Sequence, residues 1–316
     1  MIIDERAIQK ELTEVMAIPD TQLETWSHQG AVTTASATNS AIQNALHAQN
    51  SPVSGKDFDV YLQGSYKNST NIRGDSDVDI VVQLNSTFQY DLSTLSEGEK
   101  RLFGQTYPTN ATYLWRNFRD DTLRALRAYF EAQNVAEGNK SIKVLGGSGR
   151  LSADVIACIQ YKQYLRFGSL QEEIYIEGIE FYTIREGRRI INFPRPHYDK
   201  GVEKNSQQTT NGWYKPTVRV FKNARTYLID QNFLSRDIAP SYFLECLIYN
   251  VHDNQFGQSY QETFCNAVNW LRGTNLSGFM CQNGQTPLFG SSQEQWSTEQ
   301  ASQFLNAMAD LWNNWR

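Results

Sequence analysis

The stretch QGSYKNSTNIRGDSDVDIVV, residues 63–82, decides the fold. The residues that lead into it, FDVYLQ (58–63), alternate apolar and polar side chains, as a half-buried strand does. Residues 78–84, at its end, form the near-continuous apolar run of a central strand. Between these strands lie a Gly-Ser pair, a short polar loop and an Asp-x-Asp pair. We therefore expect two adjacent strands whose connection carries polar chemistry.

Gly64 and Ser65 stand where the first predicted strand gives way to a short helix. Glycine lets the backbone approach a ligand closely, and serine adds a hydroxyl group. Backbone N–H groups and the helix dipole would converge there on an anion such as a phosphate. A Gly-Ser pair alone is a weak signal, and it gains weight from the acidic pair that follows.

Asp77 and Asp79 are two residues apart at the mouth of the second strand, so both must project from the same face of the sheet. Two carboxylates held this close repel each other unless a dication lies between them. The alternative is that Asp75, Asp77 and Asp79 cap a turn and face solvent. The combination with two strands and a Gly-Ser pair favours a metal site.

Asp154 is the candidate for a third carboxylate. Two-metal phosphoryl chemistry needs such a group, because one ion activates the attacking hydroxyl while the other neutralises the triphosphate. Asp154 opens the apolar run of residues 154–159, so it either points into a polar cleft or caps the end of a strand.

The remaining pattern predicts an α+β fold, with a mixed front half and a helical back half. We expect helices at 2–17 and from residue 23 to about 49, the second being long, and a further helix at 114–130. Further strands are expected at 141–145, 152–161, 178–184 and 188–193, and helices at 213–231, 241–251, 260–272 and 297–315. A catalytic core at 1–200 and a helical lobe at 201–316 follow.

Charge and composition exclude several classes of protein. The 29 Lys and Arg against 34 Asp and Glu give a net charge of -5, which argues against docking on long nucleic acid. The N-terminus is charged where a signal peptide is apolar, and no apolar run is long enough to span a membrane. The four cysteines show no CxxC pair, and the four histidines share no metal-ligand spacing. We expect a cytoplasmic protein without a membrane partner.

A row of cations stands in the helical half. Lys215, Arg219, Lys222 and Arg225 fall at spacings of four, three and three, so one helix face presents all of them. The row is either a solvated basic face or a contact for phosphate, and Lys222 is the strongest single candidate for the contact.

The block Gly-Ser-(x11)-Asp-x-Asp, with a later strand-borne Asp, resembles the DNA polymerase beta-like nucleotidyltransferase superfamily. It is more closely similar to the bacterial cGAS/DncV-like nucleotidyltransferases, the oligonucleotide cyclases of CBASS antiphage defence. Residues 191–225 are similar to that family's region leading into the helical lobe, and residues 239–250 to its Ser-Tyr helix. The resemblance covers most of the chain and implies a polymerase beta-like core with a C-terminal helical lobe.

The resemblance also implies ligands and site residues. It assigns two Mg²⁺ ions per site, for which Mn²⁺ can substitute, and ATP and GTP, or other nucleoside triphosphates, as substrates. The choice of bases stays open on sequence alone. The residues assigned to the metals are Asp77, Asp79 and Asp154, and those assigned to the triphosphate are Gly64, Ser65, Lys222 and Ser241.

The activity that the resemblance implies is synthesis of a cyclic di- or trinucleotide, such as cyclic GMP-AMP, with release of pyrophosphate. An effector protein that senses the product would then be the partner in antiphage signalling. Two alternatives stay open on sequence alone. One is a non-cyclising nucleotidyltransferase, either oligoadenylate synthetase-like or acting on a small molecule. The other is a catalytically silent nucleotide-binding module.

Overall fold

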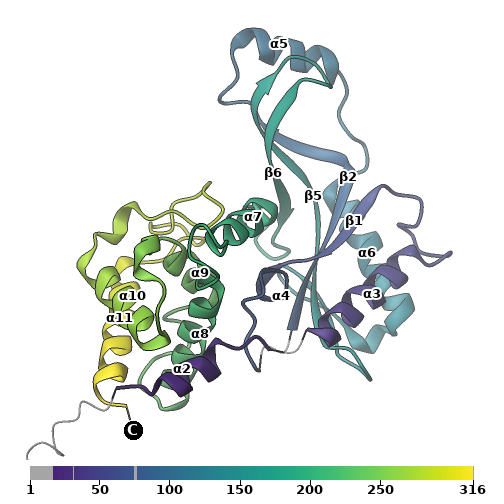
Figure 1. The fold of residues 1–316 in the computed structure, drawn as a ribbon. Coiled ribbons are helices and arrows are strands. Elements are labelled where there is room, and N and C mark those ends of the chain that lie inside the picture. The colour runs from purple at the N-terminus through teal and green to yellow at the C-terminus, as the bar shows by residue number, and fades with distance from the viewer. Residues whose placement is uncertain (1–16, 31, 75–76, 316) are drawn as a thin grey trace, which may run out of the picture. The chain divides into compact units, whose positions relative to one another are not determined.

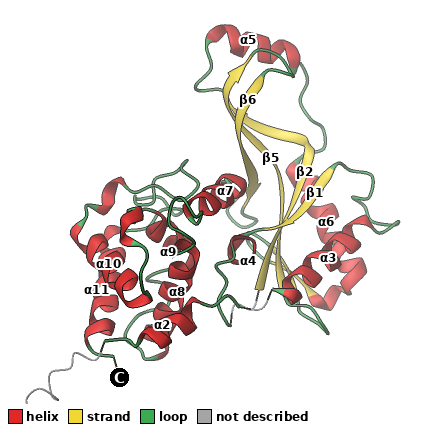
Figure 2. Cartoon of the chain, viewed as in Figure 1, coloured by secondary structure: helices red, strands yellow, loops and turns green. Residues whose placement is uncertain are grey.

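The structure, a computed structural model, describes residues 17–30, 32–74 and 77–315. The chain forms two compact units. One comprises residues 30–200, and the other combines residues 17–29 with residues 201–315. Residues 17–29 therefore group with the helical unit and not with the catalytic core predicted at 1–200. Among the described residues, the strands, yellow in Figure 2, all belong to the first unit. The predicted mixed front half and helical back half are confirmed.

The first unit is built on a mixed sheet. Its described strands have the order β1-β2-β5-β4-β3, with β6 paired to β5 and β7 to β6. The β2 and β5 pair is parallel, and the other pairs are antiparallel. The strands are β1 (Phe58–Leu62), β2 (Asp77–Asp91), β3 (Val135–Glu137), β4 (Ile142–Val144), β5 (Ser152–Phe167), β6 (Glu173–Tyr182) and β7 (Arg189–Asn192). Every predicted strand is present, and β3 is an addition.

Two helices, α3 (Thr33–His47) and α6 (Trp115–Phe130), cover one side of this sheet, as Figure 1 shows. One apolar face of α6, which includes Phe118, Leu126 and Phe130, is buried in the core between helices and sheet, together with alternate residues of β2. Trp115 Nε1 also donates a hydrogen bond to the carbonyl of Ala157 in β5, at 2.8 Å. These contacts leave the opposite face of β2, where Asp77 and Asp79 project, for polar side chains.

The single long helix expected from residue 23 to about 49 is two helices, α2 (Asp20–Ser27) and α3. Gly30 between them is packed against backbone: a Cβ there would lie 2.6 Å from the carbonyl oxygen of Ile72. Its N–H donates to the carbonyl of Asn71 at 3.0 Å. This contact with a distant loop interrupts the helix, and α2 joins the core of the helical unit through Leu23. The predicted helix at 2–17 lies almost wholly outside the described residues.

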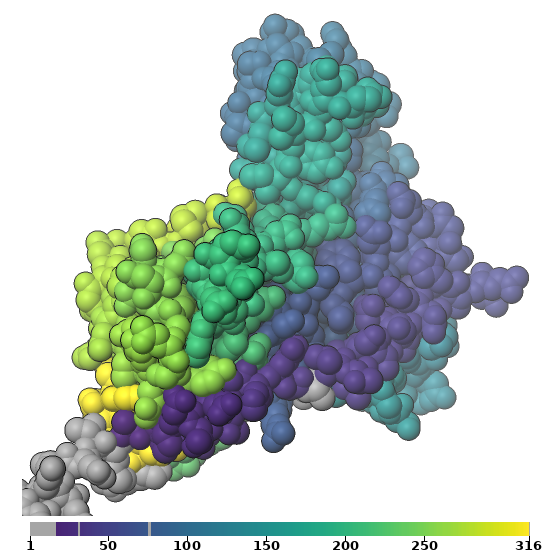
Figure 3. Space-filling view, viewed as in Figure 1, coloured from purple at the N-terminus to yellow at the C-terminus, as the bar shows by residue number. Residues whose placement is uncertain are grey.

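The segment between β2 and α6, for which the sequence predicted no helix, contains α5 (Glu97–Thr106). Ser96 and Glu99 form a capping box at its start. Phe103 is its buried residue and packs with Tyr164 and Phe167 at the far end of β5. In Figure 3 this end of the unit, blue and teal, stands out as a knob. A helix with a single buried residue has almost no apolar periodicity, so the pattern did not predict it.

The helical unit contains four predicted helices, whose ends agree with the expected ranges to within two residues. They are α8 (Tyr214–Asp230), α9 (Ser241–Tyr249), α10 (Tyr260–Gly273) and α11 (Thr298–Asn313).

An unpredicted helix, α7 (Pro194–Lys204), begins at a proline, which suits a first helical position. Short 3₁₀ turns lie at Ala132–Asn134, Asp253–Gln255 and Leu276–Gly278. No helix in the described ranges is long and apolar enough to cross a bilayer.

Candidate active site

Three aspartates meet where β2 and β5 begin. Asp77 is the first residue of β2, and Asp79 follows it on the same face of the strand. Asp154 is directly opposite Asp79 in the parallel register of β2 and β5. Neighbouring strands are about 4.8 Å apart, so Asp79 and Asp154 lie side by side. The fold therefore places together three residues that are up to 77 positions apart in the sequence.

Two residues of β4 and the turn before it reach these carboxylates. Lys143 is opposite Asp154 in the β4–β5 register, and its Nζ donates to Asp77 Oδ2 at 2.8 Å. Ser141 Oγ donates to Asp154 Oδ1 at 3.0 Å. The hydrogen bond to Asp77 is the main reason why the pKa of Lys143 is raised, and the charges of Asp77 and Asp154 raise it further.

Neither Lys143 nor Ser141 was among the predicted site residues. A local signal was available for Lys143, because it stands between Ile142 and Val144, which are both buried. Alternation along a strand then directs Lys143 to the other face. Its partner could not be named, because this depends on the order of strands in the sheet.

Carboxylate oxygens are the ligands that Mg²⁺ and Mn²⁺ prefer, so the donor set fits such an ion. Among the described residues, however, no three His, Cys, Asp or Glu side chains converge closely enough to hold one. The ion pair with Lys143 engages one oxygen of Asp77. Asp77, Asp79 and Asp154 could hold a metal once Asp77 exchanges that partner.

Gly64 is in direct contact with the acidic pair. Its φ is +65°, and a Cβ built on it would lie 2.2 Å from Asp79 Oδ2. The N–H of Gln63 donates to the carbonyl of Asp79 at 2.9 Å, which holds the two strands together at this point. Gly64 and Ser65 are the first residues of α4 (Gly64–Asn68). Binding of a phosphate by Gly64 and Ser65 stays a prediction.

The carboxylate face of the sheet continues into a network of polar side chains. Gln83 of β2 is 1% exposed, accepts a hydrogen bond from Tyr61 and donates one to Glu177 at 3.0 Å. Arg195 donates to the other oxygen of Glu177 at 2.9 Å. Burial raises the pKa of the Tyr61 hydroxyl, so it stays protonated as a donor. Beyond the aspartates, this face of the sheet is therefore polar and preorganised.

The residues predicted to reach the triphosphate from the helical lobe lie in the other unit. Lys222 is only 2% exposed, and its Nζ donates to Glu245 Oε1 at 2.6 Å. Ser241 is exposed at the start of α9. A triphosphate contact by either residue stays a prediction, and for Lys222 it would compete with the bond to Glu245.

Of the four cations of α8, Lys222 is buried, and Lys215, Arg219 and Arg225 are half-buried. Arg219 donates to the carbonyl of Ser27, and Arg225 donates to the carbonyl of Arg236. Burial lowers the pKa of both guanidinium groups. Arg219, Lys222 and Arg225 therefore each donate a hydrogen bond within the helical unit.

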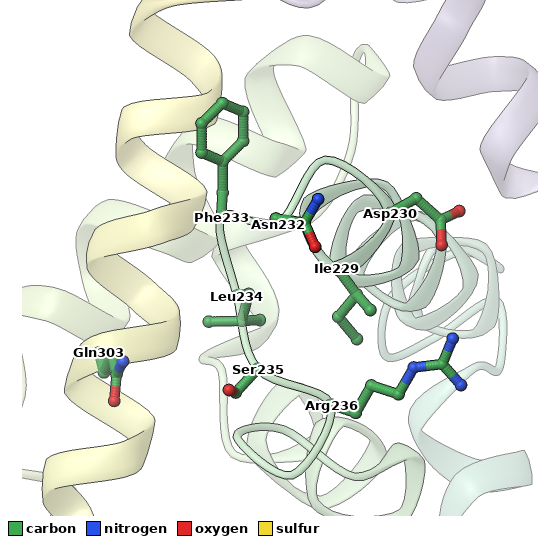
Figure 4. Close-up of a pocket in the computed structure, with 8 residues that line it drawn as sticks. All are labelled: Ile229, Asp230, Asn232, Phe233, Leu234, Ser235, Arg236 and Gln303. Atoms are coloured by element: carbon green, nitrogen blue, oxygen red, sulfur yellow. The ribbon is translucent and has the colours of Figure 1, made fainter.

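The helical unit also contains a pocket of about 630 Å³ between the end of α8, the loop after it and α11 (Figure 4). None of the predicted site residues lines it. The lining residues are Ile229, Asp230, Asn232, Phe233, Leu234, Ser235, Arg236 and Gln303. Asp230 is the only carboxylate among these lining residues. The pocket therefore lacks a group of several carboxylates such as the one on β2 and β5.

Both units match known families. Residues 47–129 match the nucleotidyltransferase domain, and residues 199–313 match the cGAS/DncV-like nucleotidyltransferase C-terminal helical domain. A cyclic UMP-AMP synthase from Rhodothermus marinus is 52% identical over 300 residues, which are 95% of this chain and 99% of the relative. The chain belongs to the cGAS/DncV-like nucleotidyltransferases. It is an enzyme of nucleotidyl transfer, as the sequence predicted.

Other members of the family agree with this assignment. A cyclic nucleotide synthase from Staphylococcus haemolyticus is 43% identical over 305 residues, covering 95% of this chain and 100% of the relative. The solved structure of the Rhodothermus marinus synthase, with Apcpp and Upnpp, has a TM-score of 0.85 and covers 94% of this chain and 97% of that one. The Elizabethkingia meningoseptica cyclic dinucleotide synthase, with GTP and Apcpp, has 32% identity, a TM-score of 0.73 and coverages of 93% and 98%. The predicted fold class is confirmed.

Proposed function

We propose that this nucleotidyltransferase joins two nucleoside triphosphates into a cyclic dinucleotide, and that UTP and ATP are the first pair to test. The observation that carries the proposal is the row of carboxylates on β2 and β5, with Asp79 and Asp154 in register and Gly64 against Asp79. The choice of bases rests on the 52% identity to a cyclic UMP-AMP synthase. The family resemblance gave ATP and GTP, or other nucleoside triphosphates, so ATP and GTP are the second pair to test.

The proposed reaction has two equivalent rounds. The ribose hydroxyl oxygen of the acceptor attacks the α-phosphorus of the donor, and a new P–O bond forms. The bond from that phosphorus to the oxygen bridging the β-phosphorus breaks, and pyrophosphate leaves. The hydroxyl proton passes through a carboxylate of the site to solvent. A second round within the linear product closes the ring and releases a second pyrophosphate.

The residues of the sheet would position the reactants. Asp77, Asp79 and Asp154 would hold two Mg²⁺ ions, or Mn²⁺ in their place, which lower the pKa of the attacking hydroxyl and offset the charge of the triphosphate. Ser141 keeps the carboxylate of Asp154 in one orientation through its hydrogen bond. Gly64 would let the backbone approach the phosphates.

The remaining triphosphate contacts and the cellular role of the enzyme are proposed from the family. Ser65, Lys222 and Ser241 would complete the triphosphate contacts. The chain would work in the cytoplasm as a CBASS enzyme, and its product would be sensed by an effector protein. Long nucleic acid is not needed as an activator, in keeping with the net charge of -5.

The test is incubation of the purified chain with all four nucleoside triphosphates and Mg²⁺ or Mn²⁺, followed by mass spectrometry of the products. Cyclic products survive phosphatase treatment, whereas linear ones lose their terminal phosphates. We expect the cyclic product to disappear when Asp77 and Asp79 are both changed to Asn. Asp91→Asn is the matched control, because Asp91 is the last residue of the same strand.

Undiminished synthesis by the Asp77→Asn/Asp79→Asn variant would refute the assignment of the carboxylates. A linear product from the unmodified chain would refute cyclisation. Tight nucleotide binding in calorimetry without any turnover would instead show a silent nucleotide-binding module.

A further inference from the structure

Lys143 crosses the face of β5 to reach the carboxylates. The strand order is β2-β5-β4, and Asp79, Asp154 and Lys143 form one row across these three strands. Since β4 is not a neighbour of β2, the side chain of Lys143 has to extend over β5 to place its Nζ 2.8 Å from Asp77 Oδ2. The side chains of Lys143 and Asp77 are 41% and 32% exposed, so the pair is open to ions in solution.

The charges explain what this ammonium group does. Three carboxylates on adjacent strands repel one another, and Lys143 offsets one of the three negative charges. A divalent ion binds a carboxylate oxygen at about 2.1 Å, along the same lone-pair directions that a hydrogen-bonded ammonium uses. An ion that binds Asp77 Oδ2 therefore competes with the ammonium group of Lys143 for this oxygen.

We propose that Lys143 is a positioning residue that takes the place of a divalent cation at Asp77 and must release this carboxylate when the ion binds. The proposal rests on the metal chemistry of the proposed function. In the absence of metal, Lys143 holds Asp77 in place beside Asp79. When ion and nucleotide bind together, the oxygens of the triphosphate offer the released ammonium a new anionic partner. Binding of the cation alone is weakened, and its binding together with the nucleotide is favoured.

The test measures binding of Mn²⁺ alone to the full chain, by electron paramagnetic resonance titration without nucleotide. Lys143→Met removes the competing charge and keeps most of the side-chain volume, so Mn²⁺ should bind roughly 2- to 5-fold more tightly, as expected for loss of a partly exposed ion pair. Lys143→Arg keeps the charge and should bind Mn²⁺ as the unmodified chain does. Lys140→Met is the matched control, because Lys140 is an exposed lysine just before the same strand.

Equal or weaker Mn²⁺ binding by Lys143→Met, or the same gain in Lys140→Met, would overturn the proposal. If Lys143→Met does not fold, Lys143→Gln carries the same comparison. Asp77→Asn separates this proposal from the proposed function. If Asp77→Asn binds Mn²⁺ as well as the unmodified chain, the metal assignment itself fails. If Asp77→Asn loses binding and Lys143→Met is unchanged, only the role of Lys143 fails.

Discussion

Replacing Gly64 with alanine should disable the active site through Asp79 while costing the fold little. The added Cβ would lie 2.2 Å from Asp79 Oδ2, and ordinary contact begins at 3.4 Å, so the carboxylate has to move by about 1.2 Å. A displacement of about 1 Å in a catalytic group lowers the rate roughly 10²-fold. We therefore expect kcat/KM for pyrophosphate release to fall by about two orders of magnitude.

Backbone strain alone must be separated from this effect. Alanine at a left-handed φ costs about 1–2 kcal/mol, and Gly64→Ala bears this cost in full. Gly187 is the matched control, because its φ is +62° and nothing lies within 4 Å of its Cβ position. Both variants should lose a similar amount in Tm, about 2–4 °C per kcal/mol. Activity of Gly64→Ala within about threefold of Gly187→Ala would refute the reasoning.

Two further predictions concern stability. Lys222→Met removes the ammonium partner of Glu245, which is 4% exposed. The free energy of unfolding, measured in urea, should fall by about 3–5 kcal/mol. A fall below about 1 kcal/mol would show that the pair is not structurally important. Hydrogen bonds from Ser96 and from the N–H of Phe167 lower the pKa of Glu99 from its usual 4.5. Ionised Glu99 therefore stabilises the fold above pH 4.5, and this contribution is lost as the pH falls through the lowered value. The Tm of Glu99→Gln should lie below that of the unmodified chain at neutral pH and approach it under acid conditions, and a difference that is constant with pH would contradict this.

Much of the fold follows from local patterns. The apolar run after Asp79 and the stripe along α6 predicted a strand and a helix, because burial of one face imposes a period on the sequence. Where little is buried, the period disappears, and α5 was missed for that reason. The break between α2 and α3 was missed because its cause, the contact of Gly30 with Ile72, is tertiary.

The spacing of cations on α8 also shows that a local pattern does not reveal tertiary contacts. It correctly placed Lys222 on a helix, and its buried pairing with Glu245 depends on a second helix, α9, that packs beside it. Whether a lysine faces solvent, a ligand or a buried acid is decided by neighbours that lie far away in the sequence. The sequence left a solvated face and a phosphate contact open for Lys222, and it did not predict the buried pairing with Glu245.

The sequence by itself determined the acidic pair, because alternation along any strand puts Asp77 and Asp79 on one face. It also determined the family, through the Gly-Ser and Asp-x-Asp block. Only the tertiary structure decided that Asp154 lies in register with Asp79 and that Lys143, 66 residues from Asp77, donates to it. Strand order and register arise from the packing of the whole sheet, and no short stretch of sequence contains them.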